Sequence, residues 1–546
     1  MKALLVGINA KYIHPAMAIY QLKANTTYDT TILEFTIKEK NNDILNSITN
    51  LINEKNINLI GFSCYLWNIE KILDISFLVK QIFPNIKILL GGPEVGFDEE
   101  FYLKSYPQID YIITSDGEFA FHELLEYLDN KRQISDVSNL RYIEKNTYIE
   151  NKIILPDLSK VNLATLDIKD LENRVIYLES GRGCPYKCSY CTASLDNKVR
   201  FFPLEKVIEI VKILMERKVK TVKFLDRTFN ANMKYMIEIL DFIDKNNICT
   251  TFQFEIVVEK FNQKAIDKVA SLKSKFLRFE IGIQSTNDIV NEAVCRKQNM
   301  VLLEQNLKLL QATNKVDLHV DLIAGLPYET KEMFINSFNR VFSYKAKELQ
   351  LGFLKFLRGT KMMDYINEHG YIYSPLPPYE IISNKYMNTN DLNEIHCTEE
   401  MLEIYYNSNK FKNTFDYLID NNIVDNFYLF FKDLYVNFEK GQLHSTFLHL
   451  DNFLKNKYNN IYNTLHYLLI KDYLSIHKTK PKLWWEYSID KENRKLLYEY
   501  ISSHSNIYIE DLYRYSIVYK DNSLNKILIS IYKDFKPTIK EIAQQH

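Results

Sequence analysis

The chain has few cysteines, almost no net charge and no long apolar run. It holds seven cysteines in 546 residues, and 68 basic residues nearly balance 69 acidic ones. Because the basic and acidic residues nearly cancel, the chain as a whole has no charge that would attract nucleic acid, and we expect no nucleic-acid partner. No stretch reaches the roughly 18 apolar residues that a membrane span requires. The opening "MKALLVGINAKYIHP" is too short an apolar run for a signal peptide, so we expect a cytoplasmic protein.

Residues 1–135 alternate apolar runs with helical patterns, as in "KALLVGI", "TTILEFTI", "INLIGFSCYLW", "KILLGGPEV" and "YIITSDGE". Continuous apolar strands separated by helices predict a parallel sheet covered on both faces, which is a Rossmann-like α/β domain. Several of these runs end in small residues: Gly7, Gly61 with Ser63, Gly91 with Gly92, and Gly117. Ligands bind at the carboxyl ends of such strands, so we expect a cofactor there.

The rest of the chain divides into three parts. Residues 136–171 predict a linker with a β-hairpin that turns at Lys145 and Asn146. Residues 172–375 repeat strand–helix units, which predicts a partial TIM-type (β/α) barrel with its chemistry at the carboxyl ends of the strands. Polar residues follow these strands: Glu179, Asp226, Arg227, Glu255, Glu280, Gln284, Ser285 and Asp321. Residues 376–546 predict a mainly α-helical domain rich in aromatic residues.

Three of the seven cysteines lie within eight positions, as Cys184, Cys188 and Cys191 in "ESGRGCPYKCSYCTAS". A cytoplasmic chain with scattered cysteines argues against a disulfide framework. The spacing suits one helix face, but a helix that included Gly181, Gly183 and Pro185 would cost on the order of 5 kcal/mol, so the segment starts as a loop. Zinc usually takes four ligands, and no second cysteine pair follows. Three thiolates with one open position suit an iron–sulfur cluster.

This Cys-x3-Cys-x2-Cys loop after the first barrel strand resembles the radical S-adenosylmethionine (SAM) superfamily. The resemblance covers roughly residues 172–375. It implies a 4Fe-4S cluster held by Cys184, Cys188 and Cys191, whose fourth iron chelates SAM. Reductive cleavage of SAM then gives methionine and a 5′-deoxyadenosyl radical. The family also implies flavodoxin or ferredoxin as the reductant.

The same resemblance assigns SAM contacts. Tyr190 would pack near the adenine, and "FLDRTFN" places Asp226 and Arg227 beside the amino acid part of SAM. "FEIGIQS" places Glu280, Gln284 and Ser285 near the ribose or carboxylate, and Gly325 in "DLIAGLPYET" lies beside the adenine. A carboxylate suits an ammonium group, an arginine suits a carboxylate, and glycine allows close backbone approach to a planar base.

An α/β domain ahead of such a barrel resembles the cobalamin-dependent class of the superfamily. The resemblance implies cobalamin contacts from the small residues at the strand ends and their neighbours: Gly7, Asn9, Ser63, Gly91, Gly92, Gly117 and Glu118. Domains that ligate cobalt from below carry Asp-x-His-x-x-Gly. Here His14 has Tyr12 and Met17 at the flanking positions, so we expect an unliganded lower face.

Methylthiotransferases share this architecture but use three N-terminal cysteines, whereas residues 1–150 contain only Cys64. We therefore expect a cobalamin-dependent radical SAM enzyme that methylates an unactivated carbon. Two alternatives remain. One is an enzyme with the same cofactors that cyclises or rearranges its substrate, and the other is a non-catalytic, metal-stabilised scaffold or sensor. The sequence identifies no catalytic residue and no substrate.

Overall fold

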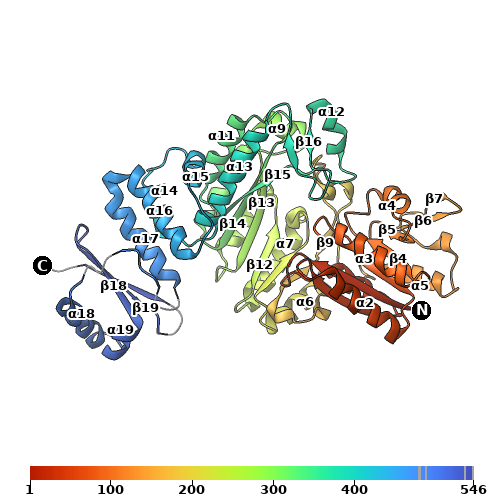
Figure 1. Cartoon of the computed structure of the whole chain (residues 1–546), viewed down its shortest axis with the longest axis horizontal. Helices are drawn as coiled ribbons and strands as arrows, with labels where there is room; N and C mark the ends of the chain where they lie inside the picture. Colours follow the sequence, from red (N-terminus) through yellow and green to blue (C-terminus); the bar gives the residue numbers. More distant parts are fainter. Residues whose placement is uncertain (478–480, 486–488, 534–536, 544–546) are drawn as a thin grey trace. The chain divides into compact units, whose positions relative to one another are not determined.

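The apolar runs at the start of the chain form a seven-stranded sheet (Figure 1). The structure is a computed structural model that describes residues 1–477, 481–485, 489–533 and 537–543. The strands lie in the order β2-β1-β3-β4-β5-β6-β7, and the first five are parallel. The order changes direction between β1 and β3, which is where open α/β sheets bind ligands. These strands are Lys2–Asn9 (β1), Asp29–Thr36 (β2), Leu59–Ser63 (β3), Lys87–Gly91 (β4), Tyr111–Ile113 (β5), Leu140–Glu144 (β6) and Thr147–Glu150 (β7).

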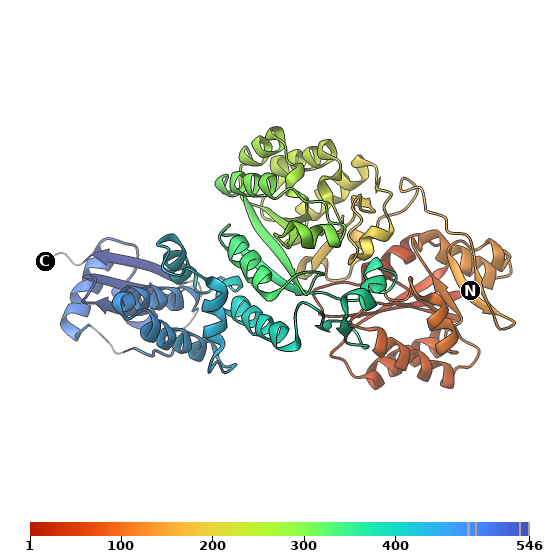
Figure 2. The same ribbon diagram turned by 90° about the horizontal axis from the view of Figure 1, so that it is seen from above.

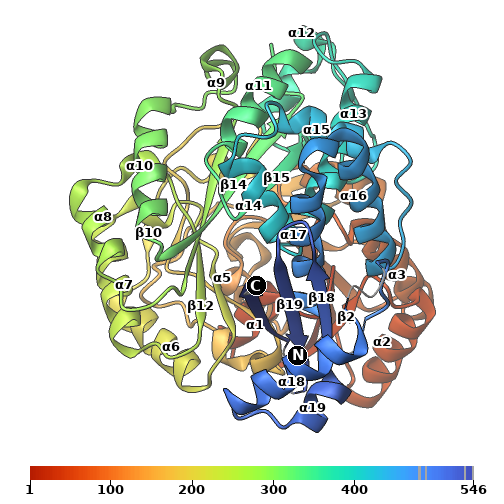
Figure 3. The same cartoon turned by 90° about the vertical axis from the view of Figure 1, so that its left-hand side faces the viewer.

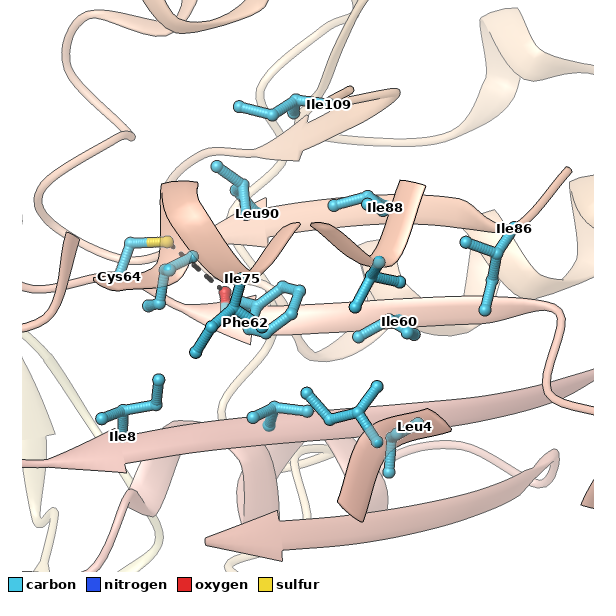
Figure 4. Close-up of a cluster of buried hydrophobic side chains, with 14 of the residues drawn as sticks. Leu4, Ile8, Ile60, Phe62, Cys64, Ile75, Ile86, Ile88, Leu90 and Ile109 are labelled. Atoms are coloured by element: carbon cyan, nitrogen blue, oxygen red, sulfur yellow. Dashed lines mark hydrogen bonds between the residues drawn. The ribbon is translucent and has the colours of Figure 1, made fainter. Parts of the chain in front are cut away.

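Helices cover this sheet on both faces. One face packs its buried Ile60 and Ile88 against helices that include Ile75 (Figure 4). On the other face a Cβ atom on Gly7 would lie 2.4 Å from the Cβ of Ala16, so glycine lets the start of α1 approach the strand. The helices are Met17–Ala24 (α1), Asn41–Lys55 (α2), Ile69–Ile82 (α3), Glu99–Ser105 (α4) and Glu118–Leu128 (α5). The predicted Rossmann-like domain is confirmed.

The hairpin predicted at Lys145 and Asn146 is present, and both residues have positive φ, at 49° and 63°. It is not a free connector, however. Strand β6 pairs antiparallel with β5, with Tyr111 opposite Tyr142, so the hairpin extends the first sheet. Both tyrosines are buried, and this burial favours sheet pairing over a solvated linker. The predicted domain boundaries stay predictions.

The central part of the chain forms a six-stranded sheet in the order β8-β11-β12-β13-β14-β15, with parallel pairing from β8 to β14. Helices lie along its outer side (Figure 3). The strands are Val175–Leu178 (β8), Thr221–Phe224 (β11), Thr251–Glu255 (β12), Leu277–Gln284 (β13), Val316–Ala324 (β14) and Glu348–Phe353 (β15). The helices are Leu204–Glu216 (α6), Met233–Asn246 (α7), Gln263–Ala270 (α8), Asp288–Ala293 (α9), Met300–Ala312 (α10) and Lys331–Phe342 (α11). The predicted partial barrel is confirmed.

The C-terminal region is mainly helical, as predicted, but it also contains a three-stranded antiparallel sheet that the sequence analysis missed (Figure 2). Alternate side chains of this sheet face opposite ways. Ile517 packs against Ile470 of α17, and Val518 packs against Leu497 of α18. The elements are Thr389–Leu402 (α13), Lys412–Asp420 (α14), Phe427–Tyr435 (α15), Leu443–Lys457 (α16), Tyr462–Ile476 (α17), Lys491–Ser503 (α18), Ile509–Tyr515 (α19), Ser516–Asp521 (β18), Lys526–Ile531 (β19) and Thr538–Ala543 (β20).

The chain divides into two compact units. The first comprises Met1–Ser337 and Leu351–Thr389, and the second comprises Phe338–Gln350 and Asn390–His546. The N-terminal sheet and most of the barrel therefore belong to one unit, which also contains the short elements Ile366–His369 (α12), Ile372–Tyr373 (β16) and Ile381–Ser383 (β17). Among the described residues no helix has both the length and the apolar character of a membrane span.

Candidate active site

A cavity of about 770 Å³ lies within the first unit, between the N-terminal sheet and the barrel. Its N-terminal wall contains residues at the carboxyl ends of β1, β3 and β4 and in the turn before α5. Its opposite wall contains residues from the ends of β8, β11 and β12, including Tyr177, Lys223 and Glu255. The carboxyl ends of two parallel sheets thus face one space, and each is the edge at which such folds bind ligands.

The cysteine loop leaves the barrel beside this cavity. Gly181–Arg182 (β9) pairs antiparallel with Arg200–Phe201 (β10), and residues 183–199 form the loop between them. Gly183 has φ +86°, and a Cβ there would lie 2.6 Å from the carbonyl oxygen of Lys198, so only glycine suits this position. The segment from Cys184 to Cys191 contains no helix, as predicted. The loop therefore begins with a turn that requires glycine at position 183.

The three thiols of this loop are free. Cys184 and Cys188 are buried and Cys191 is partly buried. The sulfur of Cys184 lies 3.5 Å from Thr228 Oγ1, and Arg296 Nη1 lies 3.9 Å from the sulfur of Cys188. Within the described residues, no three His, Cys, Asp or Glu side chains form a group that the geometry alone marks as a metal site. The assignment of these cysteines as cluster ligands stays a prediction.

The donor set nevertheless suits a thiolate-bound iron–sulfur cluster. Three free thiols occur on one loop with little access to water, and a guanidinium and a hydroxyl lie beside two of the sulfurs. Hydrogen-bond donors and positive charge near the sulfurs stabilise a negatively charged cluster. Cys64 differs, because it is fully buried in the N-terminal core, and this burial raises the pKa of its thiol.

The predicted SAM residues fall into separate groups. Asp226 is buried, and its two carboxylate oxygens accept hydrogen bonds from the backbone N–H and hydroxyl of Ser180, at 2.8 and 2.5 Å. Burial raises the pKa of Asp226 to about 7, and the hydrogen bonds from Ser180 oppose this rise. Arg227 lines the cavity with a side chain that is 57% exposed, at 3.9 Å from Glu255. Asp226 therefore orients the start of the cysteine loop, while Arg227 faces the cavity.

Glu280 lies in the barrel interior, where its carboxylate contacts Lys223 Nζ at 2.7 Å and accepts a hydrogen bond from Gln253. Ser285 is buried and donates to Glu329 Oε1 at 2.9 Å. Burial raises the pKa of Glu329 to about 8, against the effect of the Ser285 hydrogen bond, so this carboxyl favours its neutral form. Apart from Arg227, none of the predicted SAM residues is among those that line the cavity.

Three further predicted residues adopt special conformations or contacts. Gln284 has φ 68° at an irregularity in the pairing of β13 with β14. Gly325 has φ +89°, and its carbonyl oxygen accepts a hydrogen bond from the Tyr371 hydroxyl at 3.1 Å. Tyr190 is partly buried, and its hydroxyl lies 3.4 Å from Arg296 Nη1. The structure thus places Tyr190 beside Arg296, whose guanidinium also lies near the sulfur of Cys188.

The predicted cobalamin residues gather at the cavity, with one exception. Residues on its wall are Asn9, Ser63, Gly91, Gly92, Gly117 and Glu118. Gly7 does not line the cavity, because its missing side chain makes room for α1. His14 lines the cavity as well, with Nδ1 2.8 Å from the Tyr177 hydroxyl. The expectation of an unliganded lower cobalt face stays a prediction.

This wall suits a large planar cofactor. Gly92 has φ +115°, and a Cβ there would lie 2.5 Å from the carbonyl oxygen of Cys64. The buried hydroxyl of Ser63 has no hydrogen-bond partner among the described residues, and it belongs to the cavity wall. The rings of Tyr65 and Trp67 stack at 4.4 Å on the same wall. Small residues, an available hydroxyl and an aromatic pair together provide contacts for such a ligand.

The sequence analysis missed two arginines. Arg182 lies within the quoted "GRGCPY" motif and forms ion pairs with Glu118 and Glu179 at 2.5 and 2.8 Å. Arg296 lies beside Cys188 although the two are 108 positions apart. The position of Arg182 next to the motif was a usable signal. No local pattern marks Arg296, because its contact with Cys188 exists only where the segment after β13 folds back onto the cysteine loop.

Three family models match successive parts of the chain. Residues 4–125 match the B12 binding domain, and residues 178–341 match the Radical SAM superfamily. The chain thus contains a B12 binding domain followed by a radical SAM domain. The predicted enzyme class and the predicted cofactors, a 4Fe-4S cluster, SAM and cobalamin, are confirmed at this level. Residues 367–545 of this radical SAM protein match a family described as Protein of unknown function (DUF4080).

Curated relatives and solved structures agree with this family. The chain is 26% identical over 337 residues to an uncharacterized methyltransferase of Pyrococcus horikoshii, covering 58% of this chain and 71% of the relative. It is 26% identical to the cobalamin-dependent radical SAM methyltransferase TokK of Streptomyces tokunonensis, covering 50% of this chain but only 43% of TokK. The structure of the cobalamin-dependent SAM radical enzyme OxsB has the same fold, with a TM-score of 0.60, 14% identity, and coverage of 92% of this chain and 75% of OxsB.

Proposed function

We propose that this radical SAM protein methylates an unactivated carbon atom of its substrate. One observation carries the proposal: a single cavity is bordered both by the base of the cysteine loop, at Gly181 to Gly183, and by the glycine-ended strands of the cobalamin-binding domain. Methylation needs both cofactors at one carbon atom, and a cavity shared by the two domains meets that need. The methyltransferase relatives support the same reaction class.

In this proposal Cys184, Cys188 and Cys191 hold the 4Fe-4S cluster, and the N-terminal wall of the cavity holds cobalamin. When bound, the cluster with SAM supplies hydrogen abstraction from carbon, and cobalamin supplies the methyl group. The protein binds and orients the cofactors and the substrate, and it excludes water from them. Arg296 is suitably placed to pair with the SAM carboxylate, because its guanidinium lies beside Cys188 and Tyr190. Arg227 faces the cavity, and its predicted contact with the amino acid part of SAM stays part of this proposal.

The expected reductant and the expected location are also part of this proposal. We expect flavodoxin or ferredoxin as the reductant and a cytoplasmic location, where such a reductant is available. The non-catalytic scaffold or sensor conflicts with the radical SAM enzyme class reported above. Cyclisation or rearrangement stays open as the alternative, because it uses the same cofactors without transfer of the methyl group.

The first experiment tests whether the protein binds the proposed cofactors and cleaves SAM. Protein reconstituted with iron and sulfide without oxygen should bind about one cobalamin and convert SAM to 5′-deoxyadenosine in the presence of a chemical reductant. Cys188→Ala should stay folded and lose SAM cleavage, whereas in a scaffold the same change would lower stability. Zinc in place of iron, in colourless protein, would contradict the proposal.

The second experiment separates methylation from rearrangement. Cells that carry the wild-type protein or the Cys188→Ala variant are grown with methyl-labelled methionine, and their small molecules and peptides are compared by mass spectrometry. Methylation predicts a labelled product that is present only with the wild-type protein. A product that depends on the wild-type protein but carries no label would favour rearrangement.

A further inference from the structure

The base of the cysteine loop is formed by two arginines that face each other. Arg182 in β9 and Arg200 in β10 are partners in the antiparallel register. Both side chains are nearly buried, with 11% and 12% exposure. Like charges directly opposite each other destabilise a strand pair, and burial strengthens the repulsion. The loop therefore requires a negative group between its two ends.

Asp116 supplies that group from the other domain. Its Oδ1 lies 3.1 Å from Arg182 Nη1, and its Oδ2 lies 2.8 Å from Arg200 Nη1. One carboxylate thus forms ion pairs with both arginines, and each of its oxygens contacts one of them. Charge-assisted contacts of this kind are stronger than neutral hydrogen bonds and fix the direction of the guanidinium groups.

Asp116 also belongs to the cobalamin side of the cavity. It follows β5 and directly precedes Gly117 and Glu118, which begin α5 and line the cavity with it. Glu118 extends the same contact, because its Oε1 lies 2.5 Å from Arg182 Nη2. The turn predicted to contact cobalamin and the base of the loop predicted to hold the cluster therefore share one ion network.

Each arginine has a second acidic partner within the barrel sequence. Arg182 contacts Glu179 at 2.8 Å, and Arg200 contacts Asp196 at 3.0 Å. Removal of Asp116 would leave each arginine with a counter-charge of its own, so neither would become an unpaired buried charge. What is lost is the link between the two arginines and the link of Arg200 to the N-terminal domain, whereas Glu118 still joins Arg182 to that domain. Asp116 is therefore suited to position the loop rather than merely to neutralise it.

We propose that Asp116 is a positioning residue that fixes the cysteine loop against the turn before α5. The cluster and the cobalamin site are then held at a set separation across the cavity. The functional meaning of this role rests on the proposed function, since it assumes that the loop holds the cluster. The structural role does not rest on the proposed function, because it concerns only how firmly residues 183–199 are held in one conformation.

The test uses Asp116→Asn with Asp110→Asn as its matched control. Asp110 precedes the other end of β5, has a similar exposure of 17% against 15%, and also contacts two basic residues, Lys80 and Lys87 at 2.7 and 2.9 Å. Hydrogen–deuterium exchange is measured on the full chain without cofactors. We expect at least threefold faster exchange of residues 183–199 in Asp116→Asn and wild-type exchange of this loop in Asp110→Asn. Equal exchange of the loop in the two variants would overturn the proposal.

A second variant and a second readout complete the test. Arg200→Gln removes the same link from the loop side and should also speed exchange of residues 183–199, which decides the matter if Asp116→Asn fails to fold; unchanged exchange would overturn the proposal. After reconstitution, Asp116→Asn should retain less than half the iron of Asp110→Asn, and equal retention would count against positioning of the cluster ligands. If the wild-type protein itself binds no iron, the proposed function fails, while the exchange result still decides the role of Asp116.

Discussion

Two adjacent glycines on the cavity wall should differ strongly in how much stability the same substitution costs. Gly92 has φ +115°, a region that residues with a side chain rarely adopt, and a Cβ there would lie 2.5 Å from the Cys64 oxygen and 3.0 Å from the Cys64 nitrogen. Both atoms belong to the backbone, so neither moves cheaply. A strained φ costs about 1–3 kcal/mol and overpacking about the same, so we expect Gly92→Ala to lower the free energy of unfolding by about 2–6 kcal/mol.

Gly91 is the control, because its nearest neighbour would be the Ile113 oxygen at 3.5 Å, an ordinary contact. We expect Gly91→Ala to change the free energy of unfolding by less than about 1 kcal/mol, while its new methyl group occupies the cavity wall and weakens cobalamin binding. Urea unfolding followed by Trp67 fluorescence in a Trp484→Phe, Trp485→Phe background reports on the first unit alone. Equal unfolding midpoints for the two alanine variants would refute the reasoning.

Two further predictions concern buried polar groups. Ser63→Ala should stabilise the cofactor-free protein by about 1 kcal/mol, because it removes a buried hydroxyl without a partner among the described residues, and should weaken cobalamin binding; a loss of stability in the urea midpoint would contradict this. Burial raises the pKa of Glu329 to about 8. Between the ordinary pKa of a glutamate and this raised pKa, the folded protein keeps a proton on Glu329 that the unfolded chain has released. The free energy of unfolding should therefore fall as pH rises from about 5 to 8. Glu329→Gln should lessen this fall when midpoints are compared at pH 5 and pH 8, whereas parallel pH profiles would show that Glu329 is not the cause.

The sequence predicted those features that depend on local pattern. Apolar runs such as "KALLVGI" and "KILLGGPEV" predicted buried parallel strands, and their glycines predicted the cavity wall at Gly91 and Gly92, because strand-end position follows directly from where a run stops. The C-terminal sheet was missed for the same reason. Short segments such as Lys526–Ile531, whose longest apolar run is three residues, suit a strand or a buried helix equally, and helical neighbours favoured the wrong choice.

Features that depend on distant pairing were beyond the sequence. Gly7 resembled a ligand contact, but it serves the packing of Ala16, which depends on where α1 crosses the sheet. Asp116 lies in the quoted "YIITSDGE", but nothing in that stretch marks its ion pairs, because Arg182 and Arg200 approach it from another domain. A spacing rule identifies residues that act within one loop. It cannot identify an acid that joins two domains.

The central claim is that the loop of Cys184, Cys188 and Cys191 holds an iron–sulfur cluster with one iron open to SAM. Mössbauer spectroscopy of the iron-57 protein, reconstituted without oxygen and recorded before and after addition of SAM, tests it most directly. The account predicts the spectrum of a 4Fe-4S cluster in which SAM changes the signal of one iron in four. A spectrum with no such cluster, or with a cluster that SAM leaves unchanged, would contradict it.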